Sequence, residues 1–349
     1  MDGYNYPWTN LHDLNLDWML NKIRELENRL AQPQTPLGYF VNVKDFGAMG
    51  DGTTDDTAAI QAAIDSLDGP GTVFLPAGIY KISSTIILGD GAPNVNSTYH
   101  NVKLLGEGCT YMSTSMPGND LGTELQWFGA AGDSMLEVHG PIIDAGIEGL
   151  TVNGRDIAGY GVRIFCSQQG TYRRICARSC SIVAFDVTQW PGQLGNKTTN
   201  NIMCLFEDIY AWTPFNAGAT AFHIGGDPGN NLNDTNMCQF NNISLFRAPD
   251  GINLHIDFCD ASSFRNVICW CNGASTTGHY IYLDGTVKTG FPGNVVFEMV
   301  SGTMESIGSI GHLYVTGYGV GDGESLPDTL NVGGITGANG TFGTFTPVP

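Results

Sequence analysis

Acidic side chains in strand-like segments are the residues of this sequence best suited to carry out a reaction. Cleavage of a glycosidic bond requires two carboxyl groups about 5 to 10 Å apart, one of which has a raised pKa. Carboxylates on one face of neighbouring strands reach that separation, and the candidates are Asp186, Glu207, Asp208, Asp257, Asp260 and Asp284. Glu207, Asp257 and Asp260 form the candidate catalytic set. A structural role is the alternative for each, because a chain with 34 acidic residues is expected to contain such a pair by chance.

Four aromatic residues form a second candidate site. Tyr210, Trp212, Phe246 and Trp270 occupy outward positions of strand-like segments that recur along the chain. Rings on neighbouring strands make a patch too apolar to be left in contact with solvent. Two interpretations are open. The rings lie in the seam between copies of the chain or under long loops, or they stack against the flat faces of sugars.

Other reaction classes lack their motifs. The sequence has no Gly-x-Ser-x-Gly, Walker loop, His-Glu-x-x-His or dinucleotide-binding fingerprint. Its nine cysteines include no Cys-x-x-Cys pair, which argues against a zinc site and favours buried thiols. Histidines inside apparent strands are interpreted as structural residues: His223, His255, His279 and His312. We expect no organic cofactor, and a structural or catalytic divalent cation is left open.

The composition excludes several partners. Lys and Arg number 15 against 34 Asp and Glu, a net charge of −19, and no basic cluster is present, so nucleic acid is not expected to bind. No apolar run is long enough to span a membrane and no signal peptide is recognisable, so we expect synthesis in the cytoplasm without membrane insertion. Few charged residues, 14%, together with 47 glycines predict a turn-rich, all-β chain.

Residues 1–36 are predicted to form a helical segment that docks to another protein. Apolar side chains recur there at helical and heptad spacing. Pro33 and Pro36 are expected to end the helix and form a rigid linker. Two heptads are too short to hold chains together alone, and the surplus apolar surface indicates docking. The residues expected to carry anchoring or trimerisation are Trp8, Leu11, Leu14, Leu16, Trp18, Ile23, Leu26 and Leu30.

Residues 37–105 are predicted to cap a β-fold. The region opens with Phe40–Val43 and a loop at Asp45–Gly52, and Thr54 or Asp55 is expected to cap the helix that follows. The acidic residues around that cap lack the alternating ligands of an EF-hand loop, so capping is preferred to a calcium site. A strand, a tight corner and a second strand follow over 72–88.

Residues 106–315 contain an internal repeat, and 316–349 form a Gly-rich tail. Six segments share a large apolar residue at position one and Leu, Ile or Val at position four, and they begin at Ile147, Tyr172, Phe206, Phe240, Phe264 and Phe297. Their intervals are 25, 34, 34, 24 and 33 residues, which in strand-like units predicts a parallel β-helix. Position three tolerates the left-handed backbone of a sharp corner in four segments, with Gly149, Asp208, Asn242 and Asn266. Arg174 and Met299 break this rule, so different corners are expected there.

Two further features follow from the repeat. Inserts at 190–201, 225–236 and 285–294 leave their coils at similar points, so stacked coils should project them from one edge. Position two carries charges that alternate in sign between several neighbouring coils and predict exposed ion pairs: Glu148, Arg173, Glu207, Arg265 and Glu298.

Two stretches resemble known proteins. The runs Val43–Ala48, Asp51–Thr57 and Val73–Tyr80 resemble the start of pectate-lyase-like, right-handed parallel β-helices, a pattern that recurs in phage tailspikes and appendages. Asn10–Leu20 is similar to the virion-attachment segment of appendage proteins in short-tailed phages. The resemblance implies a homotrimer in the virion, anchored to collar, portal or tail proteins by its N-terminus, that binds and often cleaves host surface glycopolymers.

Three hypotheses follow. The first is a virion appendage that recognises host glycopolymer and hydrolyses it with a carboxylate pair. The second is a non-catalytic receptor-binding or structural fibre, for which the same fold suffices. The third is a bacterial polysaccharide lyase, which would use a basic residue and often Ca²⁺ and would not need an anchoring helix.

Overall fold

The computed structural model describes residues 40–67, 69–92, 97, 101–109, 122–190, 200–226, 235–273, 277–286, 292, 295–301, 304–308 and 313–319. All of them belong to the second of two units into which the chain divides, residues 1–38 and 39–349. The predicted anchor residues Trp8, Leu11, Leu14, Leu16, Trp18, Ile23, Leu26 and Leu30 therefore lie outside the described residues. Within the described part, no helix is long and apolar enough to cross a membrane.

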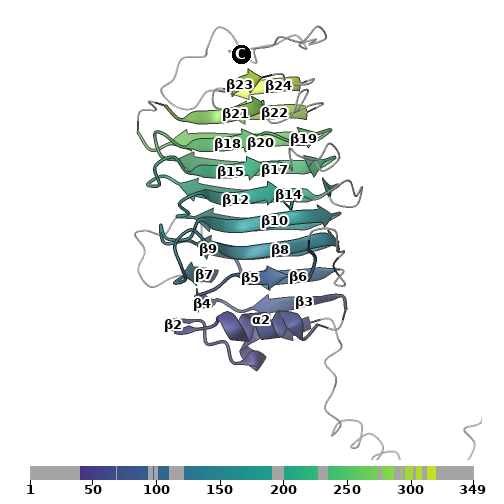
Figure 1. Cartoon of the computed structure of the whole chain (residues 1–349), viewed down its shortest axis with the longest axis vertical. Helices are drawn as coiled ribbons and strands as arrows, with labels where there is room; N and C mark the ends of the chain where they lie inside the picture. The colour runs from purple at the N-terminus through teal and green to yellow at the C-terminus, as the bar shows by residue number, and fades with distance from the viewer. Residues whose placement is uncertain are drawn as a thin grey trace, which may run out of the picture. The chain divides into compact units, whose positions relative to one another are not determined.

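The described strands form two parallel sheets, and they stack coil upon coil as a parallel β-helix (Figure 1). Sheet A contains β1 (Phe40–Asn42), β2 (Asp51–Asp55), β3 (Gly71–Leu75), β4 (Gly78–Ile82), β6 (Val102–Gly106), β7 (Thr123–Trp127), β9 (Gly146–Asn153), β11 (Thr171–Arg178), β14 (Leu205–Thr213), β17 (Gln239–Arg247), β20 (Ser263–Cys271), β22 (Val295–Ser301) and β24 (Leu313–Gly319). Sheet B contains β5 (Ile86–Leu88), β8 (Ser134–Ile143), β10 (Tyr160–Gln168), β12 (Val183–Thr188), β13 (Asn201–Ile202), β15 (Thr220–Ile224), β16 (Thr235–Asn236), β18 (Ile252–Ile256), β19 (Cys259–Asp260), β21 (His279–Gly285) and β23 (Met304–Gly308). The predicted all-β, solenoid fold is confirmed.

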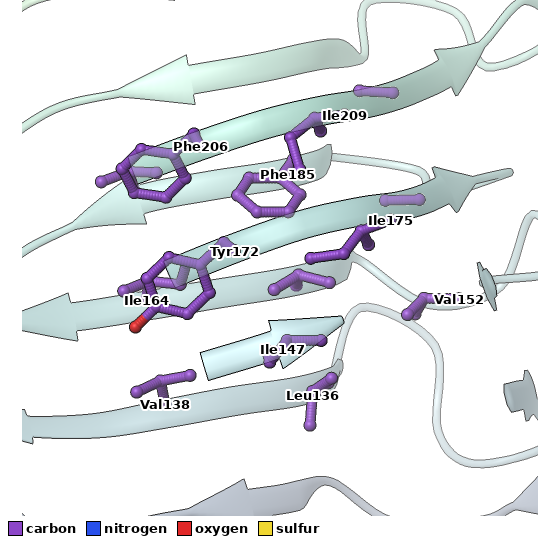
Figure 2. Packing of buried hydrophobic residues seen from close by; sticks show 14 of the residues in the cluster. Leu136, Val138, Ile147, Val152, Ile164, Tyr172, Ile175, Phe185, Phe206 and Ile209 are labelled. Atoms are coloured by element: carbon purple, nitrogen blue, oxygen red, sulfur yellow. The ribbon is translucent and has the colours of Figure 1, made fainter. Parts of the chain in front are cut away.

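The position-one residues of the repeat form a column of stacked rings inside the coils. Ring centroids lie 5.1 Å apart for Tyr172 and Phe206, 4.7 Å for Phe206 and Phe240, 4.5 Å for Phe240 and Phe264, and 4.9 Å for Phe264 and Phe297. These side chains are buried, and aliphatic residues such as Ile175 and Ile209 fill the space beside them (Figure 2). Each coil therefore buries its apolar positions only by stacking on the next coil, which is why the pattern repeats.

The corners at position three have the predicted left-handed backbone. The φ angle is 69° at Gly149, 54° at Asp208, 55° at Asn242 and 54° at Asn266. Arg174 also has a φ of 52°, so the expectation of a different corner there is wrong. Stacking explains the exception: every coil must bend at the same rung to stay in register with its neighbours. The corner side chains form a ladder, in which Asn242 donates to Asp208 over 3.1 Å and Asn266 donates to Asn242 over 2.9 Å.

The cap of the β-helix differs from its prediction at two points. Asp51 and Gly52, expected to end the loop, belong to strand β2. Helix α2 (Thr57–Asp65) follows Asp56, although the carboxylate of Asp55 accepts from the backbone N–H of Thr57 over 3.1 Å. The carboxylate of Asp56 does not cap the helix. It accepts hydrogen bonds from the backbone N–H groups of Met49 and Gly50, over 2.6 and 3.0 Å, so it fixes the preceding loop, which contains the short 3₁₀ turn η1 (Val43–Phe46).

The strand register explains where the inserts begin. Val187, Ile224, Ile256 and Leu283 occupy one rung of sheet B, at the ends of β12, β15, β18 and β21. The inserts follow β12, β15 and β21, so they begin at one edge of sheet B, as predicted. Most of their residues lie outside the described residues. The position-two ion pairs are also confirmed, with 2.9 Å between Arg173 and Glu148 and 2.8 Å between Arg265 and Glu298.

Candidate functional site

The four predicted aromatic residues meet in one groove on the outer side of sheet A. The register aligns Trp212, Phe246 and Trp270 on β14, β17 and β20, and it aligns Tyr210 with Ser244 one position earlier on the face. The rings of Trp212 and Phe246 have centroids 5.5 Å apart, and Trp270 is 41% exposed. The groove has a volume of about 280 Å³ and is lined by Tyr210, Ala211, Trp212, Ser244, Leu245, Phe246 and Trp270. None of these described lining residues is charged.

A buried ion pair occupies the coil next to this groove. Arg178 of β11 is on the same rung as Trp212. Its Nη2 lies 3.0 Å from both carboxylate oxygens of Glu124, which is almost completely buried, and Asn153 donates to the same carboxylate over 2.8 Å. The charge of Arg178 is thus neutralised by the protein itself. The groove therefore offers aromatic surface along its length and no unpaired charge at this end.

A polar ladder runs along the outer side of sheet B. Five successive strands from β8 to β18, and then β21, each place one polar residue on the same rung: Glu137, Arg163, Asp186, His223, His255 and Tyr282. Arg163 donates from Nε to Asp186 over 3.0 Å. Because the adjacent residues of each strand are buried in the core, these side chains point outward and neighbours on the rung can contact one another.

His223 is the centre of this ladder. Its Nδ1 lies 2.8 Å from Oδ1 of Asp186, and its Nε2 lies 3.2 Å from Oδ2 of Asp257. Burial alone would lower the pKa of His223, but the hydrogen bonds and negative charges of the two carboxylates raise it to about 10. Burial would likewise raise the pKa of Asp186, and its bond to His223 and the charges of His223 and Arg163 lower it instead. At neutral pH the cluster therefore contains an imidazolium between two carboxylates.

His255 has the opposite protonation state. Its ring centroid is 5.0 Å from that of His223, and burial together with the positive charge of His223 lowers its pKa to about 4. It is therefore neutral at pH 7. Nε2 of His255 and Oδ1 of Asp257 are both buried and have no hydrogen-bond partner in the structure. Two buried polar atoms next to His223 thus have hydrogen-bonding capacity that the described residues do not use.

The predicted catalytic residues are divided between the two sheets. Asp257 follows β18 and contacts His223 of the polar ladder, whereas Glu207 lies on the outer side of β14 in sheet A, on the rung of Arg173 and Asn241. Asp260 belongs to β19 and accepts a hydrogen bond from the backbone of Ala261 over 2.8 Å. The structure therefore does not bring Glu207 to Asp257.

The remaining acidic candidates form hydrogen bonds with other residues of the chain. Asp208 is a corner residue bonded to Asn242, and Asp186 joins Asp257 through His223. Asp284 lies in β21, one residue after Leu283, which pairs with Ile256, so it is on the rung of Asp257. Its carboxylate accepts from the backbone N–H of Thr286 over 2.9 Å.

The sequence indicated a structural histidine at position 223 but did not reveal its contacts with Asp186 and Asp257. A usable signal was present. The weaker strands Phe185-Asp186-Val187, Phe222-His223-Ile224 and Leu254-His255-Ile256 share an apolar–polar–apolar pattern, so their central residues align on stacked coils. Among the described residues no group of three or more His, Cys, Asp or Glu could hold a metal ion.

The beginning of the β-helix matches a known protein family. Residues 40–125 match one family model. That family is described as rhamnogalacturonase A/epimerase, pectate lyase-like. The predicted resemblance to pectate-lyase-like proteins is therefore confirmed for this part of the chain.

Curated relatives match over short segments. Mannuronan C5-epimerase AlgE1 of Azotobacter vinelandii is 42% identical over 118 residues, which cover 31% of this chain and 8% of that protein. Alginate lyase 7 of the same organism is 55% identical over 69 residues, 19% of this chain and 8% of that protein. The chain thus spans less than a tenth of the length of either relative.

Solved structures with similar folds include phage proteins. ORF18 of Geobacillus virus E2 matches with a TM-score of 0.42 and 18% identity, over 92% of this chain and 64% of that one. The phiAB6 tailspike, solved with oligosaccharides of the Acinetobacter baumannii surface polysaccharide, matches with a TM-score of 0.41 and 19% identity, over 85% of this chain and 49% of that one. The assignment of a β-helix to this chain depends on its own strand pairing.

Proposed function

We propose that this chain is a virion appendage protein that binds a glycopolymer of the host cell surface. The observation that carries the proposal is the groove of Tyr210, Trp212, Phe246 and Trp270, in which aromatic side chains from three successive coils line one uncharged surface. Sugar rings have apolar faces that pack on flat aromatic side chains. A polymer lying across the coils would meet one aromatic side chain per coil, at steps of about 4.8 Å.

The net charge of the chain argues against an anionic polymer as the ligand of the groove. The net charge is −19, so an anionic polymer is repelled at long range, and the groove offers no cation to compensate. The sugar unit in the groove is therefore uncharged. Mannuronan, which the name of one relative mentions, is an acidic polymer and does not fit this groove.

Glycan binding is tested with polymer fractions from candidate hosts. Capsule, teichoic acid and peptidoglycan fractions are immobilised, and binding of the full chain is measured. Trp270→Ala is expected to weaken binding at least tenfold, about 1.4 kcal/mol, because it removes an exposed stacking surface. Met237→Ala, which truncates an equally exposed apolar side chain outside the groove, is the matched control. Equal binding by the two variants would contradict the proposal.

Hydrolysis of the bound polymer is the second candidate function. It is favoured by Asp257, whose Oδ1 has no partner and which lies one coil from Asp284, because glycoside hydrolysis uses two nearby carboxyl groups. Asp186 does not fit the role of the acid, since its pKa is lowered. Polymer length is followed over hours with the unmodified chain and with Asp257→Asn. Shortening that the variant abolishes supports a depolymerase, and unchanged length with retained binding supports an adhesin.

Attachment to the virion is proposed for residues 1–36. It is supported by the apolar heptads and by the similarity of Asn10–Leu20 to the attachment segment of phage appendage proteins. Replacement of Leu16, Ile23 and Leu30 by polar residues should abolish incorporation into virions while the isolated chain still binds its polymer. Unchanged incorporation would refute the anchor. A homotrimer is part of the same proposal.

A further inference from the structure

Four large apolar side chains are exposed in the turns that lead from sheet A to sheet B. Phe128, Ile157, Ile182 and Phe215 are 38%, 37%, 42% and 74% exposed, and each belongs to a different, successive coil. We name these four residues the turn-edge stripe. Apolar residues scattered singly over a surface need no explanation, whereas here one such residue recurs in the sheet A-to-sheet B turn of each of four consecutive coils.

Backbone hydrogen bonds show that these turns are stacked. Gly132 donates to the carbonyl of Ile157 over 3.0 Å, Ile182 donates to Gly159 over 2.9 Å, and Thr220 donates to Ile182 over 2.8 Å. The strands that follow the turns, β8, β10, β12 and β15, lie one above the other (Figure 1). The stripe therefore runs along the stacking direction of the coils, with steps of about 4.8 Å.

The turn-edge stripe is distinct from the aromatic groove. The groove lies on strands β14, β17 and β20, whereas the stripe lies in the turns after β7, β9, β11 and β14. The two features share only the coil of β14. A polymer bound in the groove would leave most of the stripe exposed, so the stripe requires a different partner.

We infer that the turn-edge stripe is the seam between copies of this chain, a conclusion that rests on the homotrimer of the proposed function. A second copy aligned in parallel can cover the turn-edge stripe. Its own stripe has the same spacing between coils, so each apolar side chain can meet one from the other copy. The flanking charges fit the same partner. Arg155 and Asp156 are both exposed beside Ile157, so Arg155 of one copy can pair with Asp156 of the next at the same rung.

The charges of the chain favour a contact at this edge. A net charge of −19 repels copies from each other, so association needs a face that combines apolar side chains with a cation. The guanidinium of Arg155 lies over the ring of Phe128, 3.9 Å from its centroid, which places this cation directly on the stripe. An unrelated polar partner would not require this periodic apolar edge.

The seam is tested on the full chain by the mass of the particle in solution. The unmodified chain is expected to have the mass of three copies in sedimentation velocity at micromolar concentration. Ile182→Asn combined with Phe215→Asn is expected to weaken association at least 100-fold and yield single chains. Met203→Asn combined with Met237→Asn, which changes exposed apolar side chains at a different corner, should remain trimeric.

The possible outcomes distinguish the proposed seam from the proposed trimer. A trimeric stripe variant would overturn the seam but not the trimer, and a monomeric unmodified chain would overturn both. Glycan binding by the groove is measured separately on the same variants, so its failure leaves the seam unaffected. If the double variant does not fold by circular dichroism, Phe215→Cys is treated with a short bismaleimide. Cross-linked chains are then expected for Phe215→Cys beyond those for Met237→Cys, and equal yields would overturn the seam.

Discussion

Nδ1 of His223 lies 2.8 Å from Oδ1 of Asp186, although 37 residues separate them in the sequence. The contact exists because β12 and β15 pair in parallel and place both residues on one rung. On the other side of the imidazole, Asp257 supplies a second carboxylate over 3.2 Å. Three coils are therefore joined by one side chain, and the stability of this part of the β-helix should depend on its charge.

Loss of the imidazolium should destabilise the fold. His223→Gln leaves Asp186 buried with only Arg163 as a cationic partner, and removal of one member of a buried ion pair typically costs about 3 kcal/mol. The free energy of unfolding is measured with guanidinium chloride. Arg265→Gln serves as the control, because its pair with Glu298 is exposed and should contribute less than about 1 kcal/mol. Equal losses would show that burial of the His223 pair is unimportant.

The contribution of His223 should depend on pH in a defined direction. Its pKa is raised from 6.5 to about 10, so the stabilisation is fully present below pH 6.5 and is lost as the pH rises towards 10. The pKa of Asp186 is lowered, so its contribution is present above its ordinary value of 3.8 and disappears in stronger acid. The difference in unfolding free energy between the unmodified chain and His223→Gln should therefore be larger at pH 6 than at pH 9.5. A difference that is constant or grows with pH would contradict this account.

A methyl group at Gly225 should disturb the same cluster. A Cβ atom there would lie 2.5 Å from Cε1 of His223 and 2.7 Å from Oδ1 of Asp257. Gly225→Ala is expected to lower the free energy of unfolding by about 1 to 3 kcal/mol, because the ring and the carboxylate must move apart. The double-mutant cycle with His223→Ala is the control: the cost of Gly225→Ala should shrink when the ring is absent. If the losses of stability from Gly225→Ala and His223→Ala were additive, the strain at residue 225 would not arise from contact with the His223 ring.

Truncation of one ring in the interior column should reduce the free energy of unfolding more than the change at Gly225 does. Phe240 stacks between Phe206 and Phe264, with centroids 4.7 and 4.5 Å away, and is completely buried. Phe240→Ala should cost about 3 to 5 kcal/mol, since it leaves a cavity between two coils. Thermal unfolding measures the effect, and Met237→Ala on the exposed surface should change the midpoint little. A small shift for Phe240→Ala would mean that the neighbouring coils collapse into the space.

Local pattern in the sequence determined the architecture of this protein. Position one of each repeat is apolar and must be buried, and most position-three residues tolerate a left-handed corner, so strand, corner and strand could be predicted before the structure was known. The corner at Arg174 could not, because its conformation is imposed by the coils on either side and not by its residue type. The same holds for Asp56, whose carboxylate bonds to a loop that precedes it by six or seven residues instead of capping the helix.

The site was decided by tertiary structure. Which outward side chains meet depends on the register between coils, and inserts of unequal length hide that register in the sequence. Asp257 was recognised as a candidate, yet its partner is His223, 34 residues away, and not the nearby Asp260. The turn-edge stripe was missed for a related reason: Phe128, Ile157, Ile182 and Phe215 follow no common pattern along the chain, and only the stacking of their turns places them on successive coils at one edge. Burial of apolar positions is a local property that the sequence repeats, whereas contacts between polar side chains depend on how the coils stack.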